Sequence, residues 1–153
     1  MDKVVSFLWA VIYTVAFQSL RMVFTITKTQ VKGAIVAIWH EGRVLLIKKS
    51  YRKRWSVPGG MVNKGETWKQ AAVRETFEEV GLQIHEKDLM FIVEVAGDIG
   101  PRDRAHLFQV EIDGPVDIEI DRREIRIAEF VEPEEALKRT LDENIRDYLR
   151  KWL

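Results

Sequence analysis

The sequence predicts an α/β fold, an α/β/α sandwich with a mixed sheet, preceded by an apolar N-terminal helix. Between residues 29 and 153, short runs rich in β-branched and aromatic side chains are interspersed with a few helical patterns. This alternation is typical of a mixed sheet covered by helices. Ahead of it, the run from Val4 to Leu20 has no charged side chain. We therefore expect an apolar helix within residues 1–28 and a single domain over residues 29–153.

The apolar N-terminal run allows three interpretations. As a membrane anchor, its roughly 17 uncharged residues are at the short limit for crossing about 30 Å of hydrocarbon. The basic residues that follow it would keep the domain in the cytoplasm. As a packed helix, it would cover the domain or form a homodimer contact, because a helix that is apolar on nearly all sides needs burial. The third interpretation is a signal peptide, whose n-region would offer only Lys3 against Asp2. Membrane association through residues 4–26 and a homodimer thus both stay open.

Composition and charge restrict the kind of site. Lys plus Arg equals Asp plus Glu at 24 each, so bulk charge indicates no particular partner, and a nucleic-acid binder would need a local basic patch. The absence of cysteine excludes disulfides and thiolate metal sites. The three histidines have no metal-ligand spacing. Any metal must therefore be held by oxygen ligands, which favours Mg²⁺, Mn²⁺ or Ca²⁺ over structural zinc.

The first elements of the domain form a hairpin. Residues 31–39 read as a buried strand, residues 40–42 as a turn, and Val44 to Ile47 as the return strand. A basic loop follows from Lys48 to Arg54, and the sequence WSVPGG then leads into a glycine turn. A helix is expected from Thr67 to Val80, because Thr67 and Gln70 form a capping box and Gly81 ends the pattern.

The second half of the domain contributes three strands and two helices. The strands are expected over residues 89–95, 106–112 and 125–131, with a turn-rich loop over residues 96–104. Pro133 is placed where a helix begins. Asp142 is placed to cap a last helix that continues to Leu153.

The segment from Gly60 to Leu82 carries the candidate chemistry, and it reads GMVNKGETWKQAAVRETFEEVGL. On a helix, Glu75, Glu78 and Glu79 stand at i, i+3 and i+4, so they project from one face. The opposite face would pack Val73, Phe77 and Val80 on the sheet.

Three carboxylates so close together repel each other unless cations neutralise them. Arg74 lies four residues before Glu78 and can pair with one of them. A bound Mg²⁺ would balance the rest, because it takes carboxylate and phosphate oxygens together. The preceding pair Gly59-Gly60 lets bare backbone approach a metal or a phosphate, and a carbonyl freed there can serve as one more oxygen ligand.

This segment resembles the Nudix box, G-x5-E-x7-R-E-U-x-E-E-x-G-U, in which U is a bulky aliphatic residue. The positions that match in register are Gly60, Glu66, Arg74, Glu75, Glu78, Glu79, Gly81 and Leu82. The single departure is Thr76 at the first U position. Because Thr is near Val in shape, we expect a small packing effect and no loss of chemistry. The likeness in layout covers about residues 30–150 and leaves the N-terminal run outside.

The resemblance implies a metal-dependent hydrolase that cleaves a diphosphate linkage with Mg²⁺ or Mn²⁺. Carried over by position, Glu78 and Glu79 would be the main metal ligands, and Glu75 a ligand or the base that activates water. The supporting positions would be the Gly59 carbonyl as a further ligand, Gly60, Glu66 and Gly81 as structural support, and Arg74 orienting the glutamates. Outside the box, Glu124 is our candidate for one more metal ligand, and it is equally well a surface charge beside its arginine neighbours.

The substrate is less defined. The basic residues before the motif could meet substrate phosphates, although a solvated loop explains them at least as well; they are Lys48, Lys49, Arg52, Lys53 and Arg54. Tyr51 could stack on a base, although core or hairpin packing is the more common role of such a ring. We expect a small-molecule substrate of the nucleoside-diphosphate type. The alternatives are an RNA 5′-end pyrophosphohydrolase, which shares the chemistry, and a non-catalytic Nudix-fold module that binds or senses nucleotides.

Overall fold

The structure, a computed structural model, describes residues 3–97 and 99–152 and confirms the predicted α/β/α sandwich. One mixed sheet forms its middle layer, with the strand order β4-β5-β1-β2-β6 and with β3 paired to β1. Among the strand pairs of the described residues, β1–β5 is parallel and the others are antiparallel. The strands are β1 (Lys32–His40), β2 (Arg43–Lys49), β3 (Gly59–Met61), β4 (Met90–Ala96), β5 (Arg104–Glu111) and β6 (Ile125–Val131).

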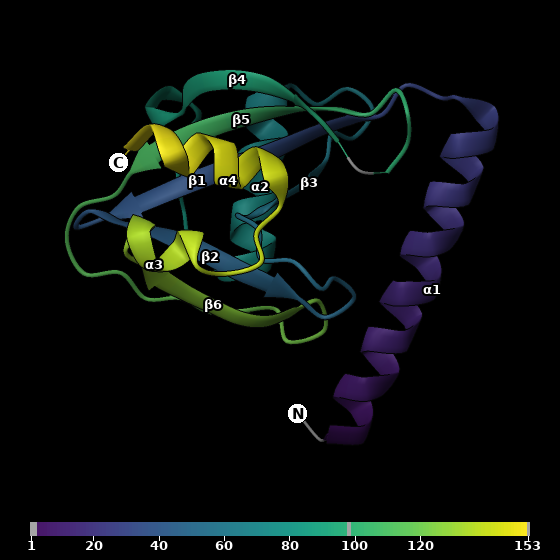
Figure 1. The fold of residues 1–153 in the computed structure, drawn as a ribbon, viewed down its shortest axis with the longest axis horizontal. Coiled ribbons are helices and arrows are strands. Elements are labelled where there is room, and N and C mark those ends of the chain that lie inside the picture. Colours follow the sequence, from purple (N-terminus) through teal and green to yellow (C-terminus); the bar gives the residue numbers. More distant parts are fainter. Residues whose placement is uncertain (1–2, 98, 153) are drawn as a thin grey trace.

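Helices cover both faces of this sheet (Figure 1). Strand alternation supplies the two cores: Val36 and Ile38 of β1 belong to the cluster under α2, whereas Ala37 and Trp39 belong to the cluster under the C-terminal helices. All four of these side chains are buried. The helices of the domain are α2 (Trp68–Val80), α3 (Pro133–Leu137) and α4 (Glu143–Leu149), with single 3₁₀ turns η1 (Glu86–Asp88) and η2 (Arg150–Trp152).

Helix α2 begins and ends where the sequence predicts. The Thr67 hydroxyl accepts from the Gln70 backbone N–H while the Gln70 side chain accepts from the Thr67 N–H, and Gly81 ends the helix at φ 72°. Its orientation differs from our expectation. The side chain of Phe77 is 53% exposed rather than packed on the sheet, whereas Glu79 is 2% exposed. The buried stripe of α2 consists of Ala71, Ala72, Thr76, Glu79 and Val80.

Three local predictions were wrong in their bounds. Strand β2 extends to Lys49, so the basic loop begins later than predicted, and the expected glycine turn contains the short strand β3. Helix α4 ends at Leu149, and Leu153 lies outside the described residues. Asp142 stands at the N-cap position, but its side chain makes no capping hydrogen bond. It lies 3.4 Å from the Arg52 guanidinium instead.

The β2–β6 ladder contains one irregularity. It is regular from Val44 to Lys48, which pairs with Ile127, and then shifts so that Lys49 pairs with Ile125. Strict alternation would put both isoleucines on one face. The shift separates them: Ile125 is 1% exposed in the core under α2, and Ile127 is 46% exposed. This bulge brings the residue before β6, Glu124, beside the end of β2.

The N-terminal segment is a single helix, α1 (Lys3–Thr27), which lies beside the domain (Figure 1). Its length and mean hydropathy would allow it to cross a membrane. One side of the helix is less exposed than the rest, and it comprises Ser6, Trp9, Ala10, Tyr13, Phe17, Leu20 and Phe24. Other sides expose large apolar side chains, among them Phe7, Ile12, Val15, Met22 and Ile26.

Candidate active site

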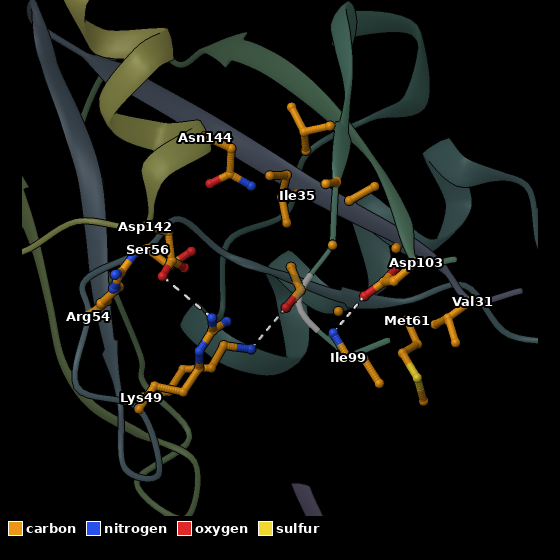
Figure 2. Close-up of a pocket in the computed structure, with 18 of the residues that line it drawn as sticks. Val31, Ile35, Lys49, Arg54, Ser56, Met61, Ile99, Asp103, Asp142 and Asn144 are labelled. Atoms are coloured by element: carbon orange, nitrogen blue, oxygen red, sulfur yellow. Dashed lines mark hydrogen bonds and ion pairs between the residues drawn. The ribbon is translucent and has the colours of Figure 1, made fainter. Parts of the chain in front are cut away.

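A cleft of about 1340 Å³ opens between α1, the loop after β2, β3 and the start of α4. Figure 2 shows the side chain of Lys49 pointing into it, with Asp142 and Asn144 on one side and Met61 and Asp103 on the other. Five residues that the sequence analysis named as substrate contacts or as the glycine pair line this cleft, namely Tyr51, Arg52, Arg54, Gly59 and Gly60. The cleft also reaches Glu75 and Glu124. These residues, far apart in the sequence, therefore share one cavity.

Arg74 joins three of the motif glutamates. Its guanidinium donates to both carboxylate oxygens of Glu66, at 2.7 and 3.0 Å, and to Glu75 at 2.7 Å. It also donates to Glu78 at 3.1 Å, one helical turn away, and to the Met61 carbonyl at 2.9 Å. The bidentate pairing fixes the plane of the guanidinium. Arg74 thus ties the loop that begins at β3 to the acidic side of α2.

Glu79 is held separately from this group. One carboxylate oxygen accepts from the Gly59 backbone N–H at 3.0 Å, and the other accepts from the Lys49 ammonium. The same ammonium donates to the Gly59 carbonyl at 2.9 Å and to Glu124 at 3.2 Å. The side chains of Lys49 and Glu79 are only 8% and 3% exposed. Residues from β2, β3, α2 and the segment before β6 therefore meet in one buried charged cluster.

The glycine pair is required by close approach. At Gly59, a Cβ would overlap the Ala34 carbonyl and the Ile35 backbone of β1, and φ is 151°. At Gly60, a Cβ would overlap the carboxylate of Glu75. At Gly59 only bare backbone fits, because the overlap is with backbone atoms, whereas at Gly60 a side chain would push the Glu75 carboxylate away from this edge of the cleft.

Glu124 is part of the cluster rather than a free surface charge. Its side chain is 21% exposed and accepts from the Tyr51 hydroxyl at 2.7 Å as well as from Lys49. The Tyr51 ring lies against the helix α1, stacked on Tyr13 with centroids 5.7 Å apart and tilted against Phe17 at 5.2 Å. Tyr51 therefore connects α1 to the carboxylate cluster.

Burial dominates the acid–base behaviour of the buried glutamates. It raises the pKa of Glu79 to about 7, against the opposing attraction of Lys49. Burial likewise raises the pKa of Glu75, with Arg74 opposing. For Lys49, burial alone would lower the pKa, but the charges of Glu79 and Glu124 outweigh it and hold the pKa well above its usual range.

The arginines proposed for substrate phosphates line the cleft, each beside an acidic partner. The Arg52 guanidinium lies 3.4 Å from Asp142 and over the Phe17 ring at 5.7 Å. The Arg54 guanidinium lies 3.6 Å from Glu143. The Arg54 pair is long and exposed to solvent, so its guanidinium can reorient toward an anion, whereas the Arg52 pair is partly buried.

The donor atoms suit a hard divalent cation in kind. Backbone carbonyl and carboxylate oxygens are the ligands that Mg²⁺ and Mn²⁺ take, and the cluster offers no competing nitrogen or sulfur ligand among the residues named above. Within residues 3–97 and 99–152, no three carboxylate or imidazole groups converge as they would around a metal. Instead Arg74 and Lys49, the cationic groups described above, hold the carboxylates. The residues therefore fit a cation in composition, while the protein's own cations occupy their oxygens.

The sequence analysis placed Lys49 in a basic loop, beside substrate phosphates or in solvent, and did not predict that it lies among the carboxylates. A signal for it exists: in VLLIKK it alternates with Leu45 and Ile47, which both lie in the core under α2, so it faces the same side as they do.

Comparison with known proteins agrees with this geometry. The model of the NUDIX domain matches residues 29–153, most of the chain. The chain belongs to the Nudix family. Nudix hydrolases generally use divalent metals. Among curated relatives, it is 49% identical over 49 residues to an RNA pyrophosphohydrolase of Actinobacillus succinogenes (strain ATCC 55618 / DSM 22257 / CCUG 43843 / 130Z), covering 32% of this chain and 25% of that protein.

A second relative is a protein of Bacillus subtilis (strain 168) that is provisionally named 8-oxo-dGTP diphosphatase. It is 43% identical over 51 residues, covering 33% of this chain and 34% of that protein. The matched segments thus span about a quarter to a third of these two relatives.

Solved Nudix structures share the fold. A MutT protein from Methanosarcina mazei Go1 aligns with a TM-score of 0.69 at 23% identity, covering 80% of this chain and 91% of that one. A C. elegans Ap4A hydrolase aligns with a TM-score of 0.66 at 24% identity, covering 78% and 94%. At this identity the likeness shows the common fold.

Proposed function

We propose that this Nudix protein is a hydrolase that cleaves a diphosphate linkage in a nucleoside-diphosphate-type substrate with Mg²⁺ or Mn²⁺. The observation that carries the proposal is the cluster of acidic side chains held against bare glycine backbone at the edge of a cleft lined by arginines. A solvated acidic helix would not bury Glu79 against the Gly59 amide. A diphosphate carries negative charge on the oxygens of both phosphate groups, so arginines around the carboxylates favour such a ligand.

In this proposal Glu78, Glu79, Glu124 and the Gly59 carbonyl would hold the cation, and Glu66 would support them through Arg74. When bound, such a cation supplies positive charge for the bridging phosphate oxygens and acidifies the attacking water. Glu75 accepts the proton of that water; its raised pKa makes the carboxylate a better base than an exposed glutamate.

Around the cleft, Arg52 and Arg54 turn from Asp142 and Glu143 to the outer phosphate. Attack on one phosphorus then breaks its bond to the bridging oxygen, and a phosphorylated fragment leaves. Tyr51 orients Glu124 through its hydroxyl while its ring packs on α1, so we assign it a positioning role beside the substrate rather than base stacking.

The substitution Glu78→Gln tests the proposal. The Glu78 side chain is 57% exposed, so the amide should leave the melting temperature unchanged while removing a charged oxygen ligand. We expect phosphate-releasing turnover to fall by about 10³-fold or more in Mg²⁺ and in Mn²⁺. The matched control is Glu111→Gln, at an exposed position in β5. Near-normal turnover of the Glu78 variant would contradict the ligand assignment.

A panel of substrates separates the finer alternatives. It contains dGTP, 8-oxo-dGTP, diadenosine tetraphosphate and a 5′-triphosphorylated RNA oligonucleotide. The basic loop after β2 favours the RNA 5′ end as a second candidate, because Arg52, Lys53 and Arg54 line the cleft. Turnover of the RNA that falls steeply with salt would support that candidate. Binding without turnover of any member would indicate a non-catalytic nucleotide-binding module.

We also propose that residues 29–153 form the catalytic domain and that α1 attaches it to the cytoplasmic surface of a membrane without crossing it. The rings of Trp9, Tyr13 and Phe17 contact Arg123, Tyr51 and Arg52 of the domain along the helix. A spanning helix would need lipid on those sides. The remaining sides are apolar and exposed, as an interfacial helix requires.

Sedimentation with vesicles tests this attachment. The full chain should sediment with phosphatidylglycerol-containing vesicles and return to the supernatant after alkaline carbonate extraction, which spares spanning helices. Resistance to carbonate would indicate a membrane-spanning anchor. If the chain does not sediment with vesicles and elutes as a dimer, the apolar sides of α1 would instead lie in a homodimer interface.

A further inference from the structure

Three of the four groups assigned above to a divalent cation, all but Glu78, already surround a cation, the ammonium of Lys49. The Gly59 carbonyl lies 2.9 Å from Nζ, one oxygen of Glu124 lies 3.2 Å away, and Glu79 accepts a third hydrogen bond. These acceptors come from β3, α2 and the segment before β6, and each of the three ammonium hydrogens has one of them. The geometry resembles a small cation site with nitrogen at its centre.

Lys49 is held in this position by the strand that carries it. It continues the alternation of Leu45 and Ile47, so its stem enters the core under α2 rather than solvent. Its neighbour Lys48 points to the other side, where its ammonium lies over the Trp55 ring at 5.6 Å and donates to the Lys53 carbonyl. Lys48 and Lys49 therefore carry the same ammonium group in different environments, so Lys48 can serve as a control for Lys49.

We propose that Lys49 is the internal counter-cation of the site, and that the divalent cation binds by displacing its ammonium from the Gly59 carbonyl, Glu79 and Glu124. The inference rests on the proposed function, because it takes those oxygens as cation ligands. Without a cation, two carboxylates and a carbonyl buried together would repel, and the ammonium satisfies them. With one, an ammonium and a divalent cation on the same carbonyl oxygen would repel each other. The two therefore compete.

Binding of Mn²⁺ alone, measured by the loss of its free paramagnetic resonance signal, tests the competition. We expect Lys49→Met to bind Mn²⁺ at least about tenfold more tightly than the wild type, since no ammonium has to leave. Its melting temperature in chelator should be lower than that of the wild type, and the rise on adding Mn²⁺ should be larger. The matched control Lys48→Met should bind Mn²⁺ within about twofold of the wild type. Equal or weaker binding by Lys49→Met would overturn the inference.

A measurement on the unsubstituted protein covers the case in which Lys49→Met does not fold. Reductive methylation followed by mass spectrometry should leave Lys49 unmodified in chelator and modify it when Mg²⁺ saturates the site. Continued protection of Lys49 at saturating Mg²⁺ would also overturn the inference.

The proposed function fails in a different way. In one outcome, Glu79→Gln abolishes no Mn²⁺ binding by the wild type, and Lys49→Met binds no Mn²⁺ either. The cation site itself is then wrong, and both proposals fall. If the wild type binds Mn²⁺ and loses it with Glu79→Gln, while Lys49→Met gains nothing, only the displacement is wrong.

Discussion

The hydroxyl of Thr76 gives a sharp test of how this helix packs. Thr76 is fully buried in α2 at the position where related motifs carry a bulky aliphatic residue, and its Oγ1 finds no hydrogen-bond partner among the described residues. A buried hydroxyl without a partner costs about 1–3 kcal/mol in desolvation. Val has nearly the same shape and no hydroxyl, so Thr76→Val removes the cost without opening a cavity. We expect the free energy of unfolding to rise by about 1–2 kcal/mol.

Urea unfolding and calorimetry measure this effect. For a chain of this size, the gain corresponds to a rise in melting temperature of roughly 2–8 °C, with an unchanged dependence on denaturant. The matched control is Thr67→Val, the same substitution at the N-cap of the same helix. It should lower stability by about 0.5–2 kcal/mol, because the Thr67 hydroxyl accepts from Gln70. If Thr76→Val left stability unchanged or lowered it, the hydroxyl would have to be satisfied in solution, and the packing argument would fail.

Two further predictions concern the site. Gly60→Ala should displace the carboxylate of Glu75 and lower kcat roughly 100-fold. The control Gly33→Ala, whose Cβ would lie 3.4 Å from its nearest neighbours, should keep kcat within about twofold of the wild type. Steady-state kinetics on both variants checks this, and a fully active Gly60 variant would refute it. The second is a pH effect in chelator. Because the pKa of Glu79 rises from 4.5 to about 7 on folding, its contribution to stability is complete below pH 4.5 and is lost as pH rises through 7. Wild-type stability should therefore fall across that window relative to Glu79→Gln, and parallel pH profiles of the two proteins would contradict the assignment.

Features set by local chemistry were predictable from the sequence. The capping box of Thr67 and the left-handed Gly81 depend only on neighbours within one turn, so they fixed the bounds of α2. The pairing of Arg74 with Glu78 follows from helical spacing alone. The motif register likewise indicated the family, because its spacing is a property of the chain and not of its folding.

Features set by tertiary contacts were not predictable in the same way. Helical periodicity defines faces of α2 but not which one meets the sheet, so Phe77 was assigned to the core while Glu79 and Thr76 occupy it. Strand β3 has only three residues and exists because β1 pairs with it. Asp142 has the right type for an N-cap, but Arg52 from a distant loop competes for its carboxylate.

Tyr51 has consequences for how this protein should be prepared. Its ring is covered by Tyr13 and Phe17, and its hydroxyl serves Glu124. A shortened chain that starts at residue 29, a natural choice for expression, would uncover that ring and change the surroundings of the Glu124 carboxylate, which lies far along the chain from every residue removed. Rate and affinity constants from such a truncation describe a different molecule, so they should be measured on a chain that includes α1.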